Sequence, residues 1–418
     1  MAHLGELATI MGKGDTRSIN QRRIKVLEVL EGTVGGARKQ VFFLATGLPK
    51  DQIEVHVACP PRRDAHFGDD HLVKDLTDAG IPVHIVPLVR EISPLKDLAA
   101  YRALVALCRR ERFDIVHGHC SKGGFLGRLA GRVAGSKTVF TPHTFGFQVV
   151  DCGRFKRGIY RGLERIAGGL TDALIAVSET ERCVALESKL VPDERIHVIC
   201  IAVDLQTSTP ITDTDTMRRE VGLPPGTLVV GFTGRFTPQK ALHVLIDAFP
   251  RILRDVTNAH LLLVGSGELE GELRDQVMRL GLVNHVHFTG HRKDATELLR
   301  IMDCFVLPSL YEGQSSSLLE AMAAGLPIVV TASPGNAEVV RDGENALVVP
   351  TNDRDALAAQ VTAILTDSAL GRRIGDAART AIDKRLTPGE QIARHTALYR
   401  TLALGEESPG GTVTEAAP

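Results

Sequence analysis

Tryptophan is absent from the 418-residue sequence, and aromatic residues make up only 4% of it. Proteins that bind single-stranded nucleic acid stack its bases on aromatic side chains, so this scarcity argues against such a partner. The formal net charge is −1, which gives no bulk electrostatic attraction to a phosphate backbone. We therefore expect no nucleic-acid partner.

Paired cysteines and long apolar runs are also missing. Seven cysteines are scattered without a C-x-x-C pair, unlike a disulfide framework or a zinc ribbon. No run of about 18 apolar residues is present, as a membrane span would need. The segment Met1 to Arg23 lacks the apolar core of a signal peptide. These features predict a protein of the reducing cytoplasm, soluble or peripheral at the inner face of the membrane.

What the sequence does contain is an alternation of short apolar runs and helical segments, typical of parallel sheets covered on both faces. The length suits two units of about 200 residues. Predicted strands of the first unit are residues 24–30, 55–59, 83–87, 115–119, 138–141, 173–177 and 197–203. Those of the second unit are residues 228–233, 259–264, 286–289, 304–308, 328–331 and 346–349.

A polar, Thr- and Asp-rich stretch at residues 205–217 separates the two units. We predict two doubly wound, Rossmann-like α/β domains facing each other across a cleft. The predicted segments are a disordered extension (1–22), an N-terminal domain (23–205), a linker (206–224), a C-terminal domain (225–385), a C-terminal helix (386–404) and a disordered tail (405–418).

The most informative stretch is residues 308–327, which contains an apolar strand end, a polar loop and a helix ending at Gly325. The free amides and the dipole of a helix N-terminus favour an anion. Gly313, Ser316 and Ser317 are small enough to let a ligand approach the backbone closely.

Two glutamates accompany this helix start. Glu312 precedes it, and Glu320 lies about one turn inside, where it can accept hydrogen bonds from hydroxyls such as those of a ribose. Ser317 and Glu320 also match a plain capping box, which needs no ligand. Both interpretations stay open on this segment alone.

Two cations follow the strand at residues 228–233. Arg235 and Lys240 flank the turn at its carboxyl end, and an Arg fork with a Lys charge can neutralise a diphosphate. A solvated surface pair is the alternative. A third turn, with Gly265 and Gly267, is a weak Gly-x-Gly signal.

In combination, the Gly-Arg loop with its lysine, the Gly-x-Gly turn, Glu312-x7-Glu320 and Ala323-x-Gly325-x-Pro327 resemble the family-4 glycosyltransferases of the GT-B fold. The resemblance covers about residues 24–400. Gly35-Gly36 and Thr141-Pro142-His143 support it in the first half.

The resemblance implies a role for each matching residue. Arg235 and Lys240 would bind the donor diphosphate, Glu312 the transferred sugar and Glu320 the ribose. His143 would face the sugar from the N-terminal domain, and Gly36 would give close backbone access. With Gly265, Gly313, Ser316 and Ser317, these residues form the predicted catalytic and donor-binding set.

The resemblance also implies a retaining, hexosyltransferase-type reaction that needs no divalent metal. The C-terminal domain would hold a nucleotide sugar, with a UDP-sugar favoured, and the N-terminal domain would hold the acceptor hydroxyl. The helix at 386–404 would return to the N-terminal domain. First-half segments look like members that build capsule, exopolysaccharide or lipid-linked glycans.

Three departures from the family pattern stand near the site. Ala241 replaces a usual glycine, Gln314 to Ser317 replace a usual Phe-Gly or Leu-Pro, and Ile201-Ala202 replace a frequent Asn-Gly. These changes put the donor choice and the interdomain turn in doubt. Three alternatives therefore stay open: a small natural-product acceptor, a nucleotide-sugar epimerase, and a non-catalytic nucleotide-sugar-binding subunit.

Two other kinds of motif could suggest a metal site. Asp213-Thr214-Asp215 lies in a polar stretch without the strand end and helper carboxylate of a metal site. The pairs His117/His119 and His285/His287 lack further ligands at metal-binding spacing, so we interpret them as structural. No metal is expected.

The segment Arg154 to Leu170 has a basic amphipathic pattern, with Phe155, Ile159, Leu163 and Ile166 at helical spacing. Such a helix can pack on its own sheet, or it can rest on an anionic membrane surface. Its glycines favour internal packing, and peripheral membrane contact is the alternative.

Overall fold

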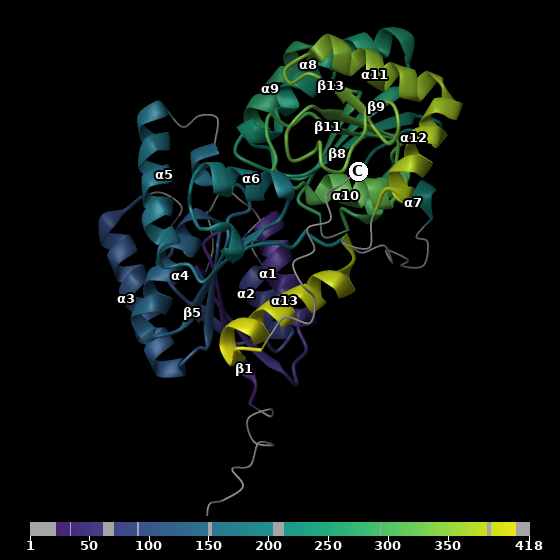
Figure 1. The fold of residues 1–418 in the computed structure, drawn as a ribbon. Coiled ribbons are helices and arrows are strands. Elements are labelled where there is room, and N and C mark those ends of the chain that lie inside the picture. Colours follow the sequence, from purple (N-terminus) through teal and green to yellow (C-terminus); the bar gives the residue numbers. More distant parts are fainter. Residues whose placement is uncertain are drawn as a thin grey trace, which may run out of the picture.

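The computed structural model describes residues 22–33, 35–61, 71–89, 92–148, 153–203, 213–292, 294–382 and 386–406. These residues form two parallel sheets, each with helices on both faces (Figure 1). The prediction of two Rossmann-like doubly wound units is confirmed.

The first sheet has the strand order β3-β2-β1-β4-β5-β6-β7, and every pairing in it is parallel. Its strands are β1 (Ile24–Leu30), β2 (Ile53–Cys59), β3 (Val83–Ile85), β4 (Ile115–His119), β5 (Lys137–Thr141), β6 (Ala173–Ala176) and β7 (Ile196–Val198). Its helices are α1 (Gly36–Gly47), α2 (Leu72–Asp78), α3 (Pro94–Glu111), α4 (Cys120–Ala134), α5 (Arg154–Gly168) and α6 (Glu179–Glu187).

The second sheet has the order β10-β9-β8-β11-β12-β13 and is also parallel. Its strands are β8 (Leu228–Thr233), β9 (Ala259–Val264), β10 (Val286–Gly290), β11 (Cys304–Leu307), β12 (Ile328–Thr331) and β13 (Leu347–Val349). Its helices are α7 (Thr214–Glu220), α8 (Leu242–Asp255), α9 (Glu270–Arg279), α10 (Ser316–Ala323), α11 (Arg354–Thr366) and α12 (Ser368–Thr380).

Several strands match their predicted bounds, because both faces of these parallel strands are buried. Residues 24–30, 115–119, 228–233, 259–264 and 328–331 agree end for end. The strand predicted at residues 197–203 is shorter, since the chain leaves the sheet after Val198. Val203 instead donates its amide to the Leu386 carbonyl at 2.8 Å and is buried in the core of the second unit, whereas Ile199 is buried in that of the first.

The predicted linker at residues 206–224 is partly helical. Asp213 caps α7 by accepting a hydrogen bond from the Asp215 amide, and Met217 is buried in the core of the second unit. The polar residues that led to the linker prediction include the N-cap and the solvent-exposed face of this short helix. The first part of the linker, residues 206–212, lies outside the described residues, as do residues 1–21 and 407–418 of the predicted disordered ends.

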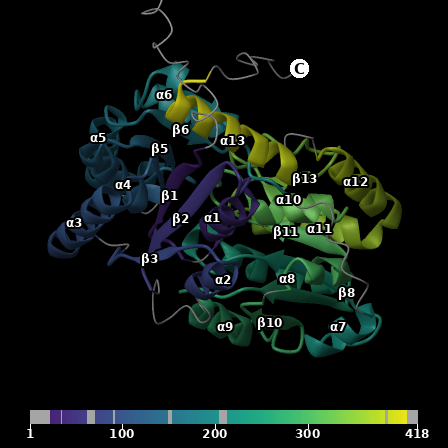
Figure 2. The ribbon, with the colours of Figure 1, turned by 90° about the horizontal axis from the view of Figure 1, so that it is seen from below.

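A last helix, α13 (Pro388–Leu404), runs back from the second unit and packs against β1 and β4 of the first (Figures 1 and 2). Its Tyr399 side chain is fully buried among first-sheet residues. The C-terminal helix is therefore part of the N-terminal core.

Glycines let α4 press closely against the first sheet. A methyl group built at Gly118 of β4 would lie 2.6 Å from the Gly124 Cα, and one at Gly124 would lie 2.2 Å from the Phe140 ring. Neither position has room for a side chain. This close packing fixes the position of α4 relative to β4, whose carboxyl end carries His119.

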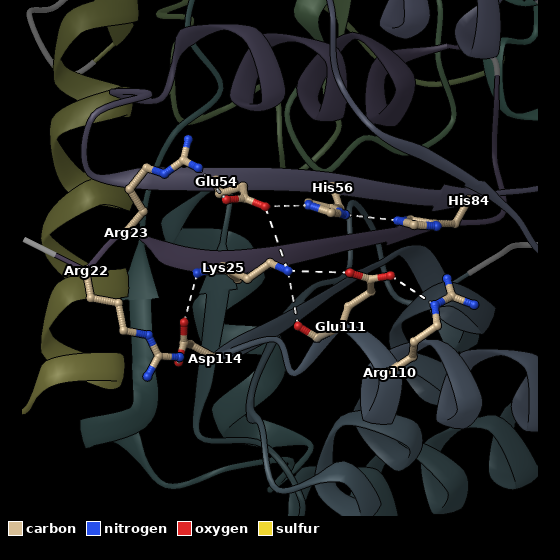
Figure 3. Close-up of polar contacts among 9 residues, drawn as sticks. All are labelled: Arg22, Arg23, Lys25, Glu54, His56, His84, Arg110, Glu111 and Asp114. Carbon is tan, nitrogen blue, oxygen red and sulfur yellow. Dashed lines mark hydrogen bonds and ion pairs between the residues drawn. The ribbon is translucent and has the colours of Figure 1, made fainter.

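A network of polar residues begins at the opposite, amino edge of this sheet and runs along β1, β2 and β3 (Figure 3). Asp114 accepts the Lys25 amide at 2.8 Å, and Arg23 pairs with Glu54 at 2.8 Å. His56 hydrogen-bonds both Glu54 at 3.0 Å and His84 at 2.9 Å. This network links the amino ends of β1 and β2 to His56 and His84, which lie inside β2 and β3.

Among the described residues, no helix has the length and apolar character needed to cross a membrane.

Candidate active site

The predicted donor residues of the second unit meet at the carboxyl ends of β8 and β11. Lys240 ends a short 3-10 turn (Pro238–Lys240) that precedes α8. Its Nζ lies 2.5 Å from Glu312 Oε1, and the two side chains are only 12% and 6% exposed. Gln239 Nε2 donates to the Tyr311 carbonyl at 2.9 Å and so joins the two loops.

Helix α10 begins next to this pair, but its cap differs from the predicted one. The Ser315 hydroxyl, not that of Ser317, accepts the Leu318 amide. Glu320 does not complete a capping box; its carboxylate lies 2.7 Å from Lys39 Nζ on α1 of the first unit. The capping-box alternative is therefore wrong, because Ser315 already satisfies the helix start.

Gly265 has a packing role at this edge. A methyl group at Gly265 would lie 1.9 Å from the Gly234 carbonyl oxygen, and one at Gly267 would lie 2.4 Å from that of Phe236. The β9–α9 loop therefore packs directly on the loop that carries Arg235. Its glycines shape the loop whether or not a ligand touches them.

Loops of the first unit face this edge directly. A methyl group at Gly35, which has a φ of 82°, would lie 3.1 Å from Arg235 Nε. One at Gly36, the first residue of α1, would lie 4.0 Å from the Ser316 hydroxyl. The N-termini of α1 and α10 thus lie near each other, and both present the positive end of a helix dipole.

His143 also lies at this boundary. It has a left-handed backbone with φ 51°, as does Thr144 with φ 89°. A methyl group at Gly313 would lie 2.9 Å from Thr144 Oγ1, so the two loops touch. Burial, followed by the charges of His119 and His117, holds the pKa of His143 well below its usual range, which keeps the imidazole neutral.

Glu181 is a site residue that the sequence pattern did not reveal. Its carboxylate accepts the Thr144 amide at 2.7 Å and the Val177 amide at 2.8 Å. Burial raises its pKa to about 7, although both amides act in the opposite direction. The side chain holds the His143–Thr144 turn against the end of β6.

Two of the departures from the family pattern contact each other. The Ile201 amide donates to Gln314 Oε1 at 2.7 Å, and the Ala202 amide donates to Gln391 Oε1 at 3.2 Å. The altered loop and the altered interdomain turn thus form one hydrogen-bonded junction. Nearby, Glu338 accepts the amides of Glu179 and Thr180 at the start of α6.

Buried hydroxyl and amide oxygens without a protein partner occur around the same edge. Within the described residues they belong to the last residue of β8 and to the loops that follow β8, β11 and β12: Thr233, Thr237, Ser309, Ser333 and Asn336. Buried polar atoms normally have hydrogen-bond partners. Their grouping fits a site that a polar ligand or ordered water completes.

The second histidine pair is hydrogen-bonded within the protein, in line with its structural interpretation. His287 Nε2 lies 2.8 Å from His260 Nδ1, and His285 Nδ1 lies 3.1 Å from the Ala259 carbonyl.

Helix α5 packs on its own unit, as expected, but not through the apolar residues that the spacing indicated. Phe155 is 82% exposed and Ile166 is 67% exposed, and Ile159 and Leu163 are also exposed. The helix docks through Glu164, Ala167 and Gly168 instead. A methyl group at Gly168 would lie 1.9 Å from the Leu190 carbonyl, so the small residues mark the buried face.

The fold and this edge together define an enzyme class with two Rossmann-like domains and a ligand site between them. Residues 34–207 match the model Glycosyltransferase Family 4, and residues 213–381 match the model Glycosyl transferases group 1.

Named relatives agree. A UDP-Gal:alpha-D-GlcNAc-diphosphoundecaprenol alpha-1,3-galactosyltransferase of Escherichia coli is 30% identical over 364 residues, covering 86% of this chain and 91% of the relative. A phosphatidyl-myo-inositol mannosyltransferase of Mycobacterium leprae is 30% identical over 353 residues, covering 83% and 88%.

The crystal structure of Anabaena HepE in complex with UDP and glucose has a TM-score of 0.76 and 22% identity, covering 91% of this chain and 100% of that chain. The chain belongs to the family-4 glycosyltransferases and has the GT-B fold. It is a glycosyltransferase.

Proposed function

We propose that this chain transfers a sugar from a UDP-sugar to a hydroxyl of a lipid-linked or polysaccharide acceptor, with retention of anomeric configuration and without a divalent metal. The observation that carries the proposal is the convergence of Arg235, Lys240, Glu312 and Glu320 opposite Gly36 and His143. The cations and helix amides of the C-terminal domain lie opposite the N-terminal loop that would face the sugar.

In this proposal the diphosphate lies between Arg235, Lys240 and the amides of Ser316 and Ser317. These groups stabilise the charge that develops as the nucleotide diphosphate leaves, which is the usual task of a divalent metal. Glu320 accepts hydrogen bonds from the ribose hydroxyls. To do so, its carboxylate exchanges Lys39 for the ribose.

The proposed chemistry needs no carboxylate nucleophile. The acceptor hydroxyl attacks the anomeric carbon from the face that the diphosphate leaves, and the departing phosphate oxygen takes its proton. Glu312 and His143 orient the sugar from opposite domains. Because Glu312 contacts Lys240, the sugar and diphosphate subsites share one charge pair.

A lipid-linked acceptor is favoured by the surface of the first unit. The exposed Phe155, Ile159, Leu163 and Ile166 of α5 lie among Arg154, Lys156, Arg161 and Arg165, all of them exposed. Apolar side chains flanked by arginine and lysine suit the surface of an anionic membrane. Leu95 and Leu98 on α3, which shares a helix layer with α4 and α5, are exposed as well.

Two further observations favour this assignment. The names of the E. coli and M. leprae relatives both contain lipid components, a diphosphoundecaprenol and a phosphatidyl-myo-inositol. The cysteines are scattered in the sequence without a C-x-x-C pair, which suits the reducing cytoplasm, where we place the enzyme at the inner face of the membrane.

The test is an acceptor-dependent assay in EDTA. The chain is incubated with single UDP-hexoses, with and without a polyprenyl-diphosphate-linked sugar in mixed micelles, and released UDP is measured. We expect UDP release that requires the acceptor and survives EDTA. Loss of all activity in EDTA, with recovery in Mg²⁺ or Mn²⁺, would overturn the metal-independent mechanism.

Other outcomes identify the alternatives. Conversion of the donor sugar into its epimer without an acceptor would indicate a nucleotide-sugar epimerase. Tight donor binding without turnover on any acceptor would indicate a non-catalytic subunit, and turnover only on small aglycones a natural-product enzyme.

A further inference from the structure

A buried chain of polar side chains lies directly behind His143. Glu28 on β1 and His119 on β4 have no solvent exposure. Glu28 Oε2 lies 2.5 Å from His119 Nε2, and His119 Nδ1 lies 3.1 Å from His143 Nε2. The three side chains thus form a hydrogen-bonded line from the sheet interior to the site.

Helix α13 supports the inner end of this line. The Tyr399 hydroxyl donates to Glu28 Oε1 at 3.0 Å. Because its proton is used there, His117 Nδ1 must donate to the Tyr399 oxygen, 2.7 Å away. His117 Nε2 lies 2.8 Å from the Thr141 hydroxyl, so every polar atom of His117 and Tyr399 has a hydrogen-bond partner.

The hydrogen-bond partners also determine which ring nitrogens of His119 and His143 carry a proton. Burial favours the neutral acid of Glu28, but the charge and hydrogen bond of His117, together with the hydrogen bond of His119, outweigh it and hold the pKa of Glu28 well below the usual range. Glu28 is therefore an acceptor, and His119 Nε2 carries a proton. Burial, then the charge of His117, lowers the pKa of His119 to about 4, so the ring is neutral and its Nδ1 accepts.

His143 must then donate through Nε2, which leaves Nδ1 as a hydrogen-bond acceptor. The backbone of the same turn is held from the other side, since the Thr144 amide is bound by Glu181 at 2.7 Å. Two consecutive left-handed residues cost free energy unless surrounding contacts hold them. The ring and the backbone of His143 are thus each tied to a different buried carboxylate.

We propose that Glu28 and His119 are positioning residues that hold His143 as the neutral Nε2-protonated tautomer, so that its Nδ1 accepts a hydrogen bond from a hydroxyl of the donor sugar. This inference rests on the proposed function, which places His143 at that sugar. Through the hydrogen bond from Tyr399 to Glu28, the C-terminal helix α13 takes part in this positioning.

A bound metal is the competing explanation of the cluster. One ligand atom from each of Glu28, His117 and His119 lies within 4.8 Å of the others. Each of these atoms, however, already has a hydrogen-bond partner in the protein. The hydrogen-bonded arrangement explains the geometry without an ion, and elemental analysis of the purified protein separates the two.

The kinetic test is a double-mutant cycle on the full chain. We expect His119→Phe to lower kcat by about 10- to 100-fold while the UDP Kd stays within about twofold, as for loss of an outer-shell partner. His143→Ala should lower kcat by at least as much, and the double variant should be no worse than His143→Ala alone. His56→Phe is the matched control, because His56 is a buried histidine of the same sheet whose hydrogen-bond partners are Glu54 and His84, outside the line from Glu28 to His143 (Figure 3).

The spectroscopic test is independent of activity. In ¹⁵N-histidine-labelled protein, His143 should show a protonated Nε2 and an unprotonated Nδ1, and His119→Phe should shift its tautomer equilibrium. A protonated Nδ1 on His143 in the wild type would overturn the proposal, as would additive kinetic losses, a His119→Phe effect equal to that of His56→Phe, or stoichiometric metal in the purified chain.

The two proposals can fail separately. Full turnover by His143→Ala would remove the sugar-facing role of His143 from the proposed function. The tautomer measurement would still decide whether Glu28 and His119 set the state of the ring.

Discussion

Lys240 Nζ lies 2.5 Å from Glu312 Oε1, although 72 positions separate the two residues in the sequence. Both side chains are largely buried at the boundary between the domains. A buried ion pair is costly to break on one side, because the remaining charge loses its partner. The cation assigned to the diphosphate and the carboxylate assigned to the sugar therefore form one unit.

This unit predicts different outcomes for its two members. Lys240→Ala should weaken UDP binding by about 10- to 100-fold, since charge-assisted hydrogen bonds to the diphosphate are lost. Glu312→Gln should leave the UDP Kd nearly unchanged and lower kcat by about 100-fold or more, as expected for a contact to the reacting sugar. Titration calorimetry and steady-state kinetics measure both, and equal losses of UDP affinity in the two variants would contradict the separate roles.

The Lys39–Glu320 pair predicts a contrast across the domain boundary. Glu320→Ala should weaken UDP binding by about 10- to 100-fold, because the ribose loses a charged acceptor. Lys39 is 53% exposed, so its ion pair contributes about 1 kcal/mol or less to stability. Lys39→Ala should therefore keep or improve UDP affinity with a small change in Tm; a loss equal to that of Glu320→Ala would show that Lys39 itself binds the nucleotide.

The exposed face of α5 predicts membrane binding. Phe155→Glu with Ile166→Glu should abolish sedimentation with phosphatidylglycerol vesicles, since each buried apolar side chain contributes about 1.5–3 kcal/mol. Turnover on a short, water-soluble acceptor should be unchanged. The control is Met278→Glu with Val283→Glu, two exposed apolar residues of the second unit. Equal vesicle binding by both double variants would exclude α5 as the contact.

Glu181 predicts a pH effect with a defined sign. Its folded-state pKa of about 7 exceeds the ordinary value of 4.5, so the folded chain holds a proton that the unfolded chain releases. This group's contribution to stability is present below pH 4.5 and is lost as pH rises from there through 7, by about 3 kcal/mol in total.

Glu181→Gln isolates this effect, because an amide does not titrate. The variant should have a lower Tm than the wild type at pH 5, because the side-chain NH2 group of the glutamine faces a backbone N–H. The difference in Tm should narrow by pH 8, because the wild type loses the contribution of Glu181 over this range. Thermal melts of both proteins at several pH values provide the measurement. A gap that stays constant across this range would show that Glu181 ionises normally in the folded chain.

Local sequence patterns predicted the two-domain architecture, because the ends of buried strands depend on nearby residues alone. Strands such as residues 259–264 are apolar on both faces and bounded by turns, so burial alone fixes their ends. The donor residues follow strand ends in a recognisable spacing, and topology brings such ends to one edge. The assignments of Arg235, Lys240, Glu312 and Glu320 as donor ligands remain predictions.

What the sequence did not reveal depends on contacts between distant segments. Glu320 pairs with Lys39 across 281 positions, and Tyr399 meets Glu28 across 371. No periodicity encodes such pairs. The error on α5 has a different cause: the apolar spacing predicts the buried face, whereas the helix packs through small residues, and Gly168 closely approaches Leu190 and Val191.

The most direct test of the donor site is a thermal-shift titration with a panel of nucleoside diphosphates and nucleotide sugars, in EDTA, on the wild type and Glu320→Ala. We predict that UDP and one or two UDP-sugars raise the Tm of the wild type in the presence of EDTA, and that the shift is strongly reduced in the variant. No shift with any member of the panel, or an equal shift in both proteins, would contradict the assigned site.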